Sequence, residues 1–296
     1  MRTVLTVAAV LTVVAISGAA ALHALLHKRD SRSALGWVAF CVLFPVVGGF
    51  VYWLLGSNRV NTRARKLRGR FGAQPSGPRD PGADQLTTVF SVVPADLARM
   101  CHIATVGDRV TRRPLLRGNA VEPLVCGEQA YPAMLAAIDS AEHSVHLLTY
   151  LFDGKRTRER FVGALARARE RGVRVRVLLD GVGELYGFPR AGKLLQRRGV
   201  EVARFLPPSL GSRGIHVNLR NHRKVLVVDG LVGFTGGMNL RDEHEVESTP
   251  PRRAVRDLHF RVRGPVVADL ERVFLEDWEF ATGQRGLEPR VTDPPA

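Results

Sequence analysis

Cysteine is scarce in this chain, since only Cys41, Cys101 and Cys126 occur in 296 positions. Their wide spacing fits neither a disulfide framework nor a metal knuckle, and it weakly favours a reducing compartment. Histidines, cysteines and carboxylates do not gather at metal-ligand spacings elsewhere in the sequence either. The sequence therefore predicts no metal ion and no other cofactor.

Acidic residues are also few. The chain has 28 Asp and Glu against 43 Lys and Arg, which gives a formal net charge of +15. Such an excess favours polyanionic partners or an anionic membrane surface, and it carries no information about the fold. A basic protein without any special partner is the plain alternative. The content of hydrophobic residues, 45%, is ample for a core.

Two long apolar stretches dominate the first 56 residues. They run from Thr3 to Leu26 and from Ala34 to Leu55, and each is about long enough to cross a bilayer core as a helix. We interpret residues 1–56 as a two-helix transmembrane anchor. The alternative is a cleaved signal peptide that ends at the small-residue cluster SGAAALHA and leaves one span.

The distribution of basic residues predicts the orientation of this anchor. HKRDSR lies between the two stretches, whereas six Arg and Lys follow the second one between residues 59 and 70. The positive-inside rule then places the C-terminal region in the cytoplasm, in a multi-pass protein of the cell membrane. Residues 57–88 are rich in Arg, Gly, Pro and Asp and predict a linker, because such a segment cannot bury enough apolar surface to fold alone.

Strand-like and helix-like segments alternate in the remaining region, residues 89–296. This alternation favours an α/β fold in which helices sandwich a mixed sheet. The predicted strands cover 145–152, 173–181, 200–205, 225–228, a segment directly after Gly230, and 258–264; the predicted helices cover 157–172, 190–198 and a segment that begins at Pro265.

Polar residues flank one of the predicted strands in NHRKVLVVDGLVGFTGGMN, residues 221–239. Its β-branched run, 225–228, predicts a buried strand, and Asp229 with Gly230 predicts the turn that ends it. His222 and Lys224 stand two residues apart, so in a strand both side chains project to the same side. We assign Asp229 to the turn, because it lies at the far end of the strand from His222.

The residues after this strand suit a phosphate group. Gly236 and Gly237 allow the backbone to come close to a substrate, and the side-chain amide of Asn239 can donate a hydrogen bond to a phosphate oxygen. Displacing an alcohol from a phosphodiester needs a nucleophile, a proton donor and groups that hold the phosphate oxygens. Taken singly, each residue has an ordinary structural explanation, such as a surface lysine or a turn.

The complete pattern is more specific than its parts. The order His222, Lys224, Asp229, Gly236-Gly237 and Asn239 resembles the HKD motif of the phospholipase D superfamily. The segment NHRKVLVVDGLVGFTGGMNLRDEH is similar to the first of two such motifs in bacterial cardiolipin synthases. HKRDSRSALGWVAFCVLFPVVGGFVYWLLG resembles the N-terminal membrane hairpin of that family, and AMLAAIDSAEHSVHLLTYLF, RGVRVRVLLDG, RRGVEVARFLPP and VRDLHFRVRGPVVADL resemble its first catalytic half.

This resemblance implies a phospholipase D-like sheet and a membrane-bound phosphatidyltransferase. It implies that His222 is the nucleophile that forms a phosphohistidine, that Lys224 and Asn239 bind the phosphate, and that Asp257, in VRDLH, orients His222. It further implies a phosphatidylglycerol-like phospholipid as the substrate.

The family has two HKD motifs, and this sequence contains one. Three hypotheses follow: a transferase whose site is completed by a homodimer or a partner chain, a truncated or non-catalytic accessory half, and a phosphodiesterase or nuclease. The basic charge would suit a nucleic acid, but the predicted membrane anchor makes nucleic acid the least favoured partner.

Overall fold

A computed structural model describes residues 1–28, 30–56, 118–208 and 220–289, together with residues 103, 106, 107 and 110. The chain divides into two compact units, Met1–Arg63 with Pro208–Leu219, and Ala64–Pro207 with Arg220–Ala296. The predicted linker, residues 57–88, lies outside the described residues. The proposed domain boundaries therefore stay predictions.

Apolar helices make up the described part of the first unit. They are α1 (Arg2–His27), α2 (Ser31–Leu43), α3 (Pro45–Val51) and the π-helical turn η1 (Tyr52–Gly56). Within the described ranges, α1 is the single helix that is long and apolar enough to cross a membrane. This helix supports association of the chain with a membrane.

The second predicted span is two shorter helices instead of one. Pro45 has no backbone N–H to donate and its ring clashes with the preceding turn, so α2 ends at Leu43 and α3 begins at Pro45. Gly49 then lies against α1, where an added Cβ would be 3.2 Å from Oγ of Ser17. Small residues allow such close approach of apolar helices.

The second unit contains a seven-stranded mixed sheet in the order β1-β7-β6-β5-β2-β3-β4. The pairs β2–β3 and β3–β4 are parallel, and the other pairs are antiparallel. The mixed sheet is thus confirmed. Its strands are β1 (Ala120–Val125), β2 (Ser144–Thr149), β3 (Arg174–Asp180), β4 (Glu201–Phe205), β5 (Val225–Val228), β6 (Val232–Gly236) and β7 (Leu258–Arg263).

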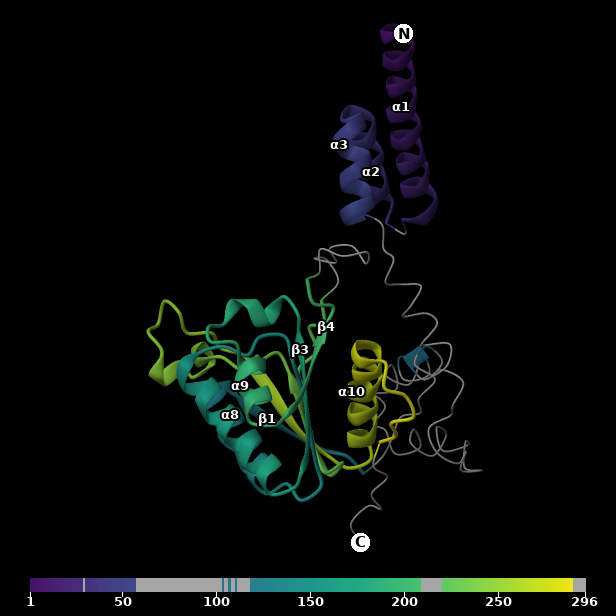
Figure 1. Cartoon of the computed structure of the whole chain (residues 1–296). Helices are drawn as coiled ribbons and strands as arrows, with labels where there is room; N and C mark the ends of the chain where they lie inside the picture. Colours follow the sequence, from purple (N-terminus) through teal and green to yellow (C-terminus); the bar gives the residue numbers. More distant parts are fainter. Residues whose placement is uncertain are drawn as a thin grey trace, which may run out of the picture. The chain divides into compact units, whose positions relative to one another are not determined.

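Helices cover both faces of this sheet, with α8 and α9 on one side of the strands and α10 on the other (Figure 1). Alternate side chains of β2 and β3 serve the two faces. Leu147 and Val177 belong to the larger core cluster with residues of α7 and α8, whereas Leu148 and Leu178 pack with Phe274 of α10. The helices are α7 (Cys126–Asp139), α8 (Lys155–Glu170), α9 (Ala191–Arg197) and α10 (Val266–Thr282).

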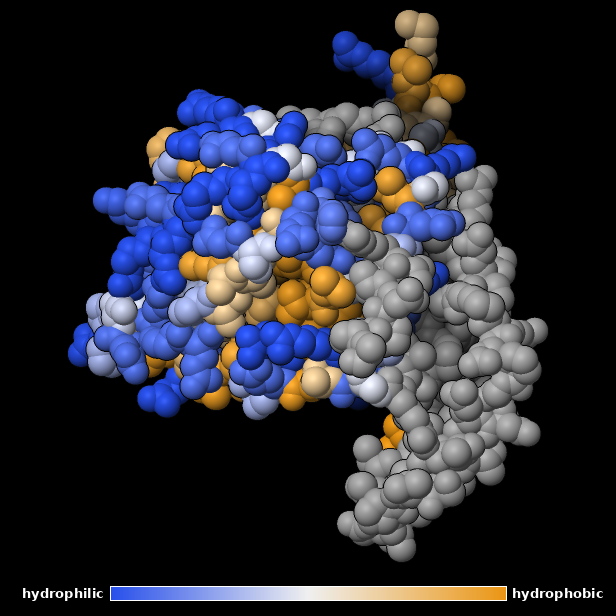
Figure 2. Space-filling view, turned by 90° about the horizontal axis from the view of Figure 1, so that it is seen from below, coloured by the Kyte–Doolittle hydropathy of each residue, from blue (hydrophilic) through white to orange (hydrophobic). Residues whose placement is uncertain are grey.

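One face of the second unit is mainly polar. Figure 2, which views the molecule from below, shows hydrophilic residues over most of the surface that is not grey, with one group of hydrophobic residues near the middle of the view. A sheet buried on both faces and a polar exterior are what the alternating sequence pattern predicts.

Two elements escaped prediction. β1 contains Pro123, which weakens a strand signal but is tolerated at the edge of a sheet, and β1 is an edge strand. α7 contains Pro132 and starts at Cys126, a residue with a positive φ of 57°. Both elements therefore break the local rules on which sequence-based prediction relies.

The pairing brings the ends of several strands together at one end of the sheet, where the loops between strands lie. Leu148, near the end of β2, pairs with Val225 at the start of β5. Gly236, the end of β6, pairs with His259 near the start of β7. The residues that follow β2, β3 and β6 therefore lie at the same end of the sheet as those that precede β5 and β7. We refer to this end as the site edge.

Candidate functional site

His222 and Lys224 converge on one aromatic ring at the site edge. His222 is exposed, and its imidazole stacks on the ring of Tyr150, with the centroids 4.2 Å apart. Nζ of Lys224 lies 5.8 Å from the centroid of the same ring and donates a 2.6 Å hydrogen bond to the carbonyl oxygen of His222. Both residues precede β5 and are not part of the strand itself.

Two carboxylates bind the residues on either side of His222. Oδ2 of Asp180, the last residue of β3, accepts a hydrogen bond from the backbone N–H of Asn221 at 3.1 Å. Oδ2 of Asp277, on α10, accepts a 2.7 Å bond from the side-chain amide of Asn221 and pairs with Arg223 at 2.5 Å. Asn221 is therefore anchored to both β3 and α10, and Arg223 is anchored to α10.

Lys224 is half-buried beside a carboxylate. Burial lowers the pKa of Lys224, and the negative charge of Asp257 offsets part of that shift. A cation that has lost part of its hydration interacts more strongly with an anion than a fully hydrated one does. The site edge thus presents a partly desolvated ammonium group next to the exposed imidazole.

Asp257 lies near Lys224 and Gly237. Oδ1 of Asp257 accepts a 2.7 Å hydrogen bond from the backbone N–H of Leu258, and a Cβ on Gly237 would overlap the Asp257 carboxylate. In the part of the chain that the structure describes, no hydrogen bond joins Asp257 to His222. In this geometry Asp257 interacts with Lys224 through its charge. The orientation of His222 by Asp257, which the sequence resemblance implied, has no hydrogen bond among the described residues to support it.

The two glycines permit a close approach to β7. Gly236 has a φ of +153°, and a Cβ on it would lie 2.8 Å from Nδ1 of His259. Gly237 meets Asp257 in the same way. The described contacts of both glycines are thus with neighbouring protein atoms. From the sequence, these glycines were expected to let the backbone approach a substrate, and this packing against protein was not foreseen.

Asn239 is held with its amide in a defined orientation. Its Oδ1 accepts a 3.1 Å hydrogen bond from the backbone N–H of Leu151, which leaves the NH₂ end of the amide to donate to another group. The hydroxyl of Tyr131, on α7, donates to the carbonyl oxygen of Asn239 at 2.8 Å. The expected role of Asn239 as a hydrogen-bond donor to phosphate stays a prediction.

Asp229 lies at the opposite end of β5 from His222. Its backbone adopts a φ of 55°, and its carboxylate accepts hydrogen bonds from the backbone N–H groups of Glu142 at 2.9 Å and of His143 and Ser144 at 2.7 Å each. Three backbone donors occupy this carboxylate, so it joins the start of β2 to the end of β5.

Sequence reasoning missed four residues of this site: Tyr150, Asp180, Asp277 and His259. Tyr150 and Asp180 stand at the carboxyl ends of two predicted strands, and this position was a usable signal. Asp277 gave none, because its partners are more than fifty positions away in the sequence.

Metal-ligating side chains do not cluster in the described ranges, since no group of three or more His, Cys, Asp and Glu there is arranged to hold a metal ion. His259 is nearly fully buried, and burial lowers its pKa to about 4. Its imidazole is neutral at pH 7 and is therefore not a ready proton donor.

The two-faced mixed sheet and the His–Lys–Asn arrangement at its edge define a phospholipase D-like domain. Residues 134–278 match the family described as "Cardiolipin synthase, PLD-like domain", and residues 4–57 match "Phospholipase_D-nuclease N-terminal". Residues 134–278 therefore form a phospholipase D-like domain of the cardiolipin synthase type.

The chain is also similar to individual proteins. The chain is 31% identical to a cardiolipin synthase of Geobacillus kaustophilus over 91% of its own length and 53% of that protein. It is 30% identical to one of Alkalihalophilus pseudofirmus, over 90% and 52%. The chain thus spans about half the length of the curated relatives it matches. Among solved structures, Nuc of Salmonella typhimurium, a phospholipase D family member, matches with 21% identity and a TM-score of 0.43, over 55% of this chain and 96% of that one.

Replacing Asp229 tests its contacts with β2. Asp229→Asn puts an NH₂ group where a carboxylate oxygen now accepts a backbone N–H, so we expect the free energy of unfolding to fall by about 1–3 kcal/mol. Urea denaturation in detergent, followed by the fluorescence of tryptophan, measures this change. The control is Asp139→Asn, whose 45% exposed side chain pairs with Arg167 and should contribute less than about 1 kcal/mol. Unchanged stability of Asp229→Asn would contradict this account.

The buried imidazole of His259 predicts a loss of stability in mild acid. The pKa of His259 is about 4 in the folded chain against an ordinary value of 6.5, so between these pH values the unfolded state binds a proton that the folded state does not. Stability should fall as the pH drops from 6.5 to 4, by up to about 3 kcal/mol from this residue.

Urea denaturation at a series of pH values measures this slope. His259→Gln should flatten it, whereas His143→Gln, which changes a side chain that is 54% exposed, should leave it unchanged. An equal slope in wild type and His259→Gln would show that other groups produce the acid sensitivity.

Proposed function

We propose that this chain is a membrane-bound phosphatidyltransferase of the cardiolipin synthase type, in which His222 is the nucleophile. The observation that carries the proposal is the convergence of His222 and Lys224 on the ring of Tyr150 at the site edge. The similarity of the chain to curated cardiolipin synthases, and the match of residues 134–278 to that family, support it.

In the proposed reaction a nitrogen of the His222 imidazole attacks the phosphorus of a phospholipid. A nitrogen–phosphorus bond forms as the bond to the leaving alcohol breaks, and the departing oxygen takes a proton from a general acid. A second alcohol then attacks phosphorus, loses its proton to the same group and releases His222. Stacking on Tyr150 limits the orientations that the imidazole adopts before the attack.

Lys224 and Asn239 are the proposed phosphate-binding residues. The ammonium group of Lys224 and the free NH₂ end of Asn239 supply a cation and a neutral donor for the non-bridging oxygens, which carry the charge of the transition state. Gly236 and Gly237 allow the strand end that leads to Asn239 to pack closely against β7. Asp257 belongs to the proposed site through its charge interaction with Lys224.

The described residues do not supply a clear general acid. His259 is neutral at pH 7, and its side chain is buried, so it does not fill this role. We propose that a second HKD half supplies the acid, from a second copy of this chain or from a partner chain. The curated relatives, which are about twice as long as the matched region, support a site built from two halves. If no second half is present, the chain is a non-catalytic accessory half.

The proposed substrate is a phosphatidylglycerol-like lipid, and the proposed location is the cell membrane. In this proposal residues 1–56 cross the bilayer twice, with the larger part of the chain in the cytoplasm. The apolar helix α1 and the excess of basic residues after residue 56 support this arrangement.

His222→Ala should lower turnover of phosphatidylglycerol by at least about 10³-fold, because it removes the proposed nucleophile. Acid-quenched mass spectrometry of wild type with labelled lipid should detect a phosphatidyl adduct on His222. The matched control is His143→Ala, which alters an exposed histidine at the other end of β2 and should keep wild-type turnover.

Comparable turnover by wild type and His222→Ala, with no adduct, would refute the phosphohistidine assignment. Lack of turnover in all three proteins would favour the accessory half. The active species should also be at least dimeric in detergent or should require a partner chain, so a fully active monomer would contradict the two-half site.

Protease treatment tests the proposed topology. Protease added to right-side-out cells should leave the region after residue 56 intact, because the positive-inside rule keeps it in the cytoplasm. The same protease should digest this region after lysis, as the control for cleavability. Digestion of the C-terminal region in intact cells would overturn the orientation.

A further inference from the structure

The segment after β3 passes next to Tyr150. It starts with the 3₁₀ turn η3 (Gly183–Tyr186), and a Cβ on Gly183 would overlap the carbonyl oxygen of Tyr150. Burial raises the pKa of Tyr150, and the neighbouring Tyr186 adds to that shift. This segment therefore borders the ring on which His222 stacks.

Large apolar side chains are exposed in this segment. The exposed fractions are 47% for Leu185, 68% for Tyr186 and 92% for Phe188. A single exposed apolar residue is common on protein surfaces, whereas a group of them marks a surface that binds a partner or a membrane. Three such residues within four positions, beside the candidate site, form a group of this kind.

Cations follow the apolar residues, and no acidic residue balances them. Residues 185–200 contain no Asp or Glu. Arg190, Lys193 and Arg197 are exposed, and within the described ranges none of the three forms an ion pair with a carboxylate. Glu184, the acidic residue just before this stretch, is buried and pairs with Arg204 at 2.5 Å.

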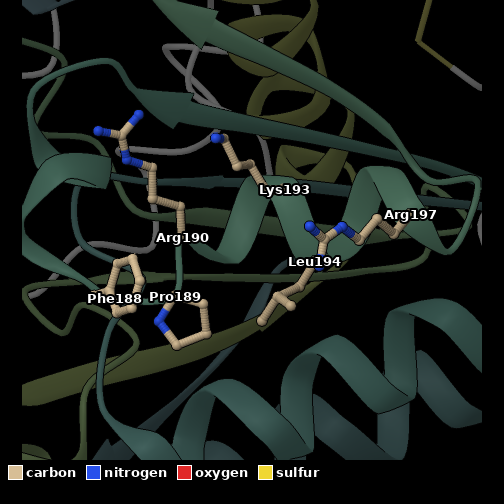
Figure 3. A pocket seen from close by; sticks show the side chains of 6 residues that line it. All are labelled: Phe188, Pro189, Arg190, Lys193, Leu194 and Arg197. Carbon is tan, nitrogen blue, oxygen red and sulfur yellow. The ribbon is translucent and has the colours of Figure 1, made fainter.

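The side chains of Phe188 and of the three cations line a cavity of about 410 Å³. Its apolar wall is made by Phe188, Pro189 and Leu194, and the three cations complete the lining. Figure 3 shows the rings of Phe188 and Pro189 close to the side chains that project from α9. The combination of apolar wall and cationic groups suits a molecule that is apolar at one end and anionic at the other.

We propose that residues 185–197, the docking segment, bind the catalytic domain to the surface of an anionic bilayer. Leu185, Tyr186 and Phe188 enter the headgroup region, as aromatic and aliphatic side chains of interfacial segments do. Arg190, Lys193 and Arg197 bind lipid phosphates, whose negative surface potential attracts basic residues.

A membrane explains this surface better than a nucleic acid does. A nucleic acid would account for the cations but would leave an exposed Leu–Tyr–x–Phe set without an apolar partner. The chain also carries the apolar helix α1, so a bilayer is held close to the domain whenever the helix is inserted. Docking through this segment would bring the surroundings of Tyr150 and His222 to the level of the headgroups.

Hydrogen–deuterium exchange of the full-length chain tests the proposal without any need for turnover. The protein is compared in vesicles of phosphatidylcholine alone and in vesicles with an equal amount of phosphatidylglycerol. We expect exchange in residues 183–198 to slow by about threefold or more in the anionic vesicles, because bound lipid restricts solvent access and local opening. Exchange in β3 and α10 should be the same in both.

Two double variants and one single variant separate binding by the docking segment from the effect of the overall positive charge. Arg190→Ser with Lys193→Ser should lose the slowing of exchange in anionic vesicles, and Phe188→Ser should weaken it. Arg174→Ser with Arg263→Ser removes two exposed cations at the opposite end of the sheet and should keep it. Unchanged exchange in β3 and α10 shows that a variant is folded. If a variant does not fold, the proposal is tested by the wild-type protein alone, through the difference in exchange between the two kinds of vesicle.

Equal exchange of the docking segment in the two kinds of vesicle would overturn the proposal, and so would protection that the Arg190–Lys193 variant retains. Protection by an RNA oligonucleotide in detergent, but not by anionic vesicles, would assign the segment to nucleic acid and reject the membrane. Because exchange is independent of catalysis, an inactive but protected protein would reject the transferase alone, and an active but unprotected protein would reject the docking alone.

Discussion

The antiparallel pairing of β2 with β5 is the contact on which the site depends. At one end, Leu148 opposite Val225 brings Tyr150, just after β2, beside His222, just before β5. At the other end, the carboxylate of Asp229 accepts the backbone N–H groups that lead into β2. The histidine and the aspartate of the motif therefore stabilise opposite ends of one strand pair, and the aspartate can influence His222 only through the register of that pair.

Side chains from outside the motif then restrict the segment before β5. Asp180 from β3 and Asp277 from α10 take hydrogen bonds or ion pairs from the residues on both sides of His222. The charge of these carboxylates is balanced by hydrogen bonds and ion pairs with neighbouring protein groups. Lys224 differs, because burial lowers its pKa and Asp257 compensates only in part. The site edge thus combines firmly held carboxylates with a cation that still has room for an anionic group.

Half a site and a membrane surface are two aspects of the same arrangement. In the proposed function the side chains at the site edge provide a nucleophile and phosphate-binding groups, and the buried, neutral His259 does not add an acid. The docking segment, with its exposed apolar and cationic residues, follows directly after Gly183, which lies against Tyr150. A lipid phosphate held at a bilayer surface satisfies both features, since its headgroup is anionic and its neighbours are apolar.

Local patterns in the sequence were enough to predict most elements of the second unit. Period-two and helical repeats predicted six of the seven strands and the helices α8, α9 and α10 near their observed bounds, because those repeats reflect burial on one or both faces. The spacing of His222 and Lys224 predicted that their side chains lie together, because residues two apart in an extended chain share a side.

Other features were decided only by the tertiary structure. The edge strand β1 and the anchoring of the residues beside His222 by Asp180 and Asp277 depend on which segments meet in space, and the sequence alone carries no distance between them. Gly236 and Gly237 show this most clearly. Their missing Cβ atoms were expected to let the backbone come close to a substrate, and in the structure the space beside them is occupied by Asp257, just before β7, and by His259 of β7. Because strand order determines which neighbour occupies the space beside a glycine, that neighbour was known only once the sheet was assembled.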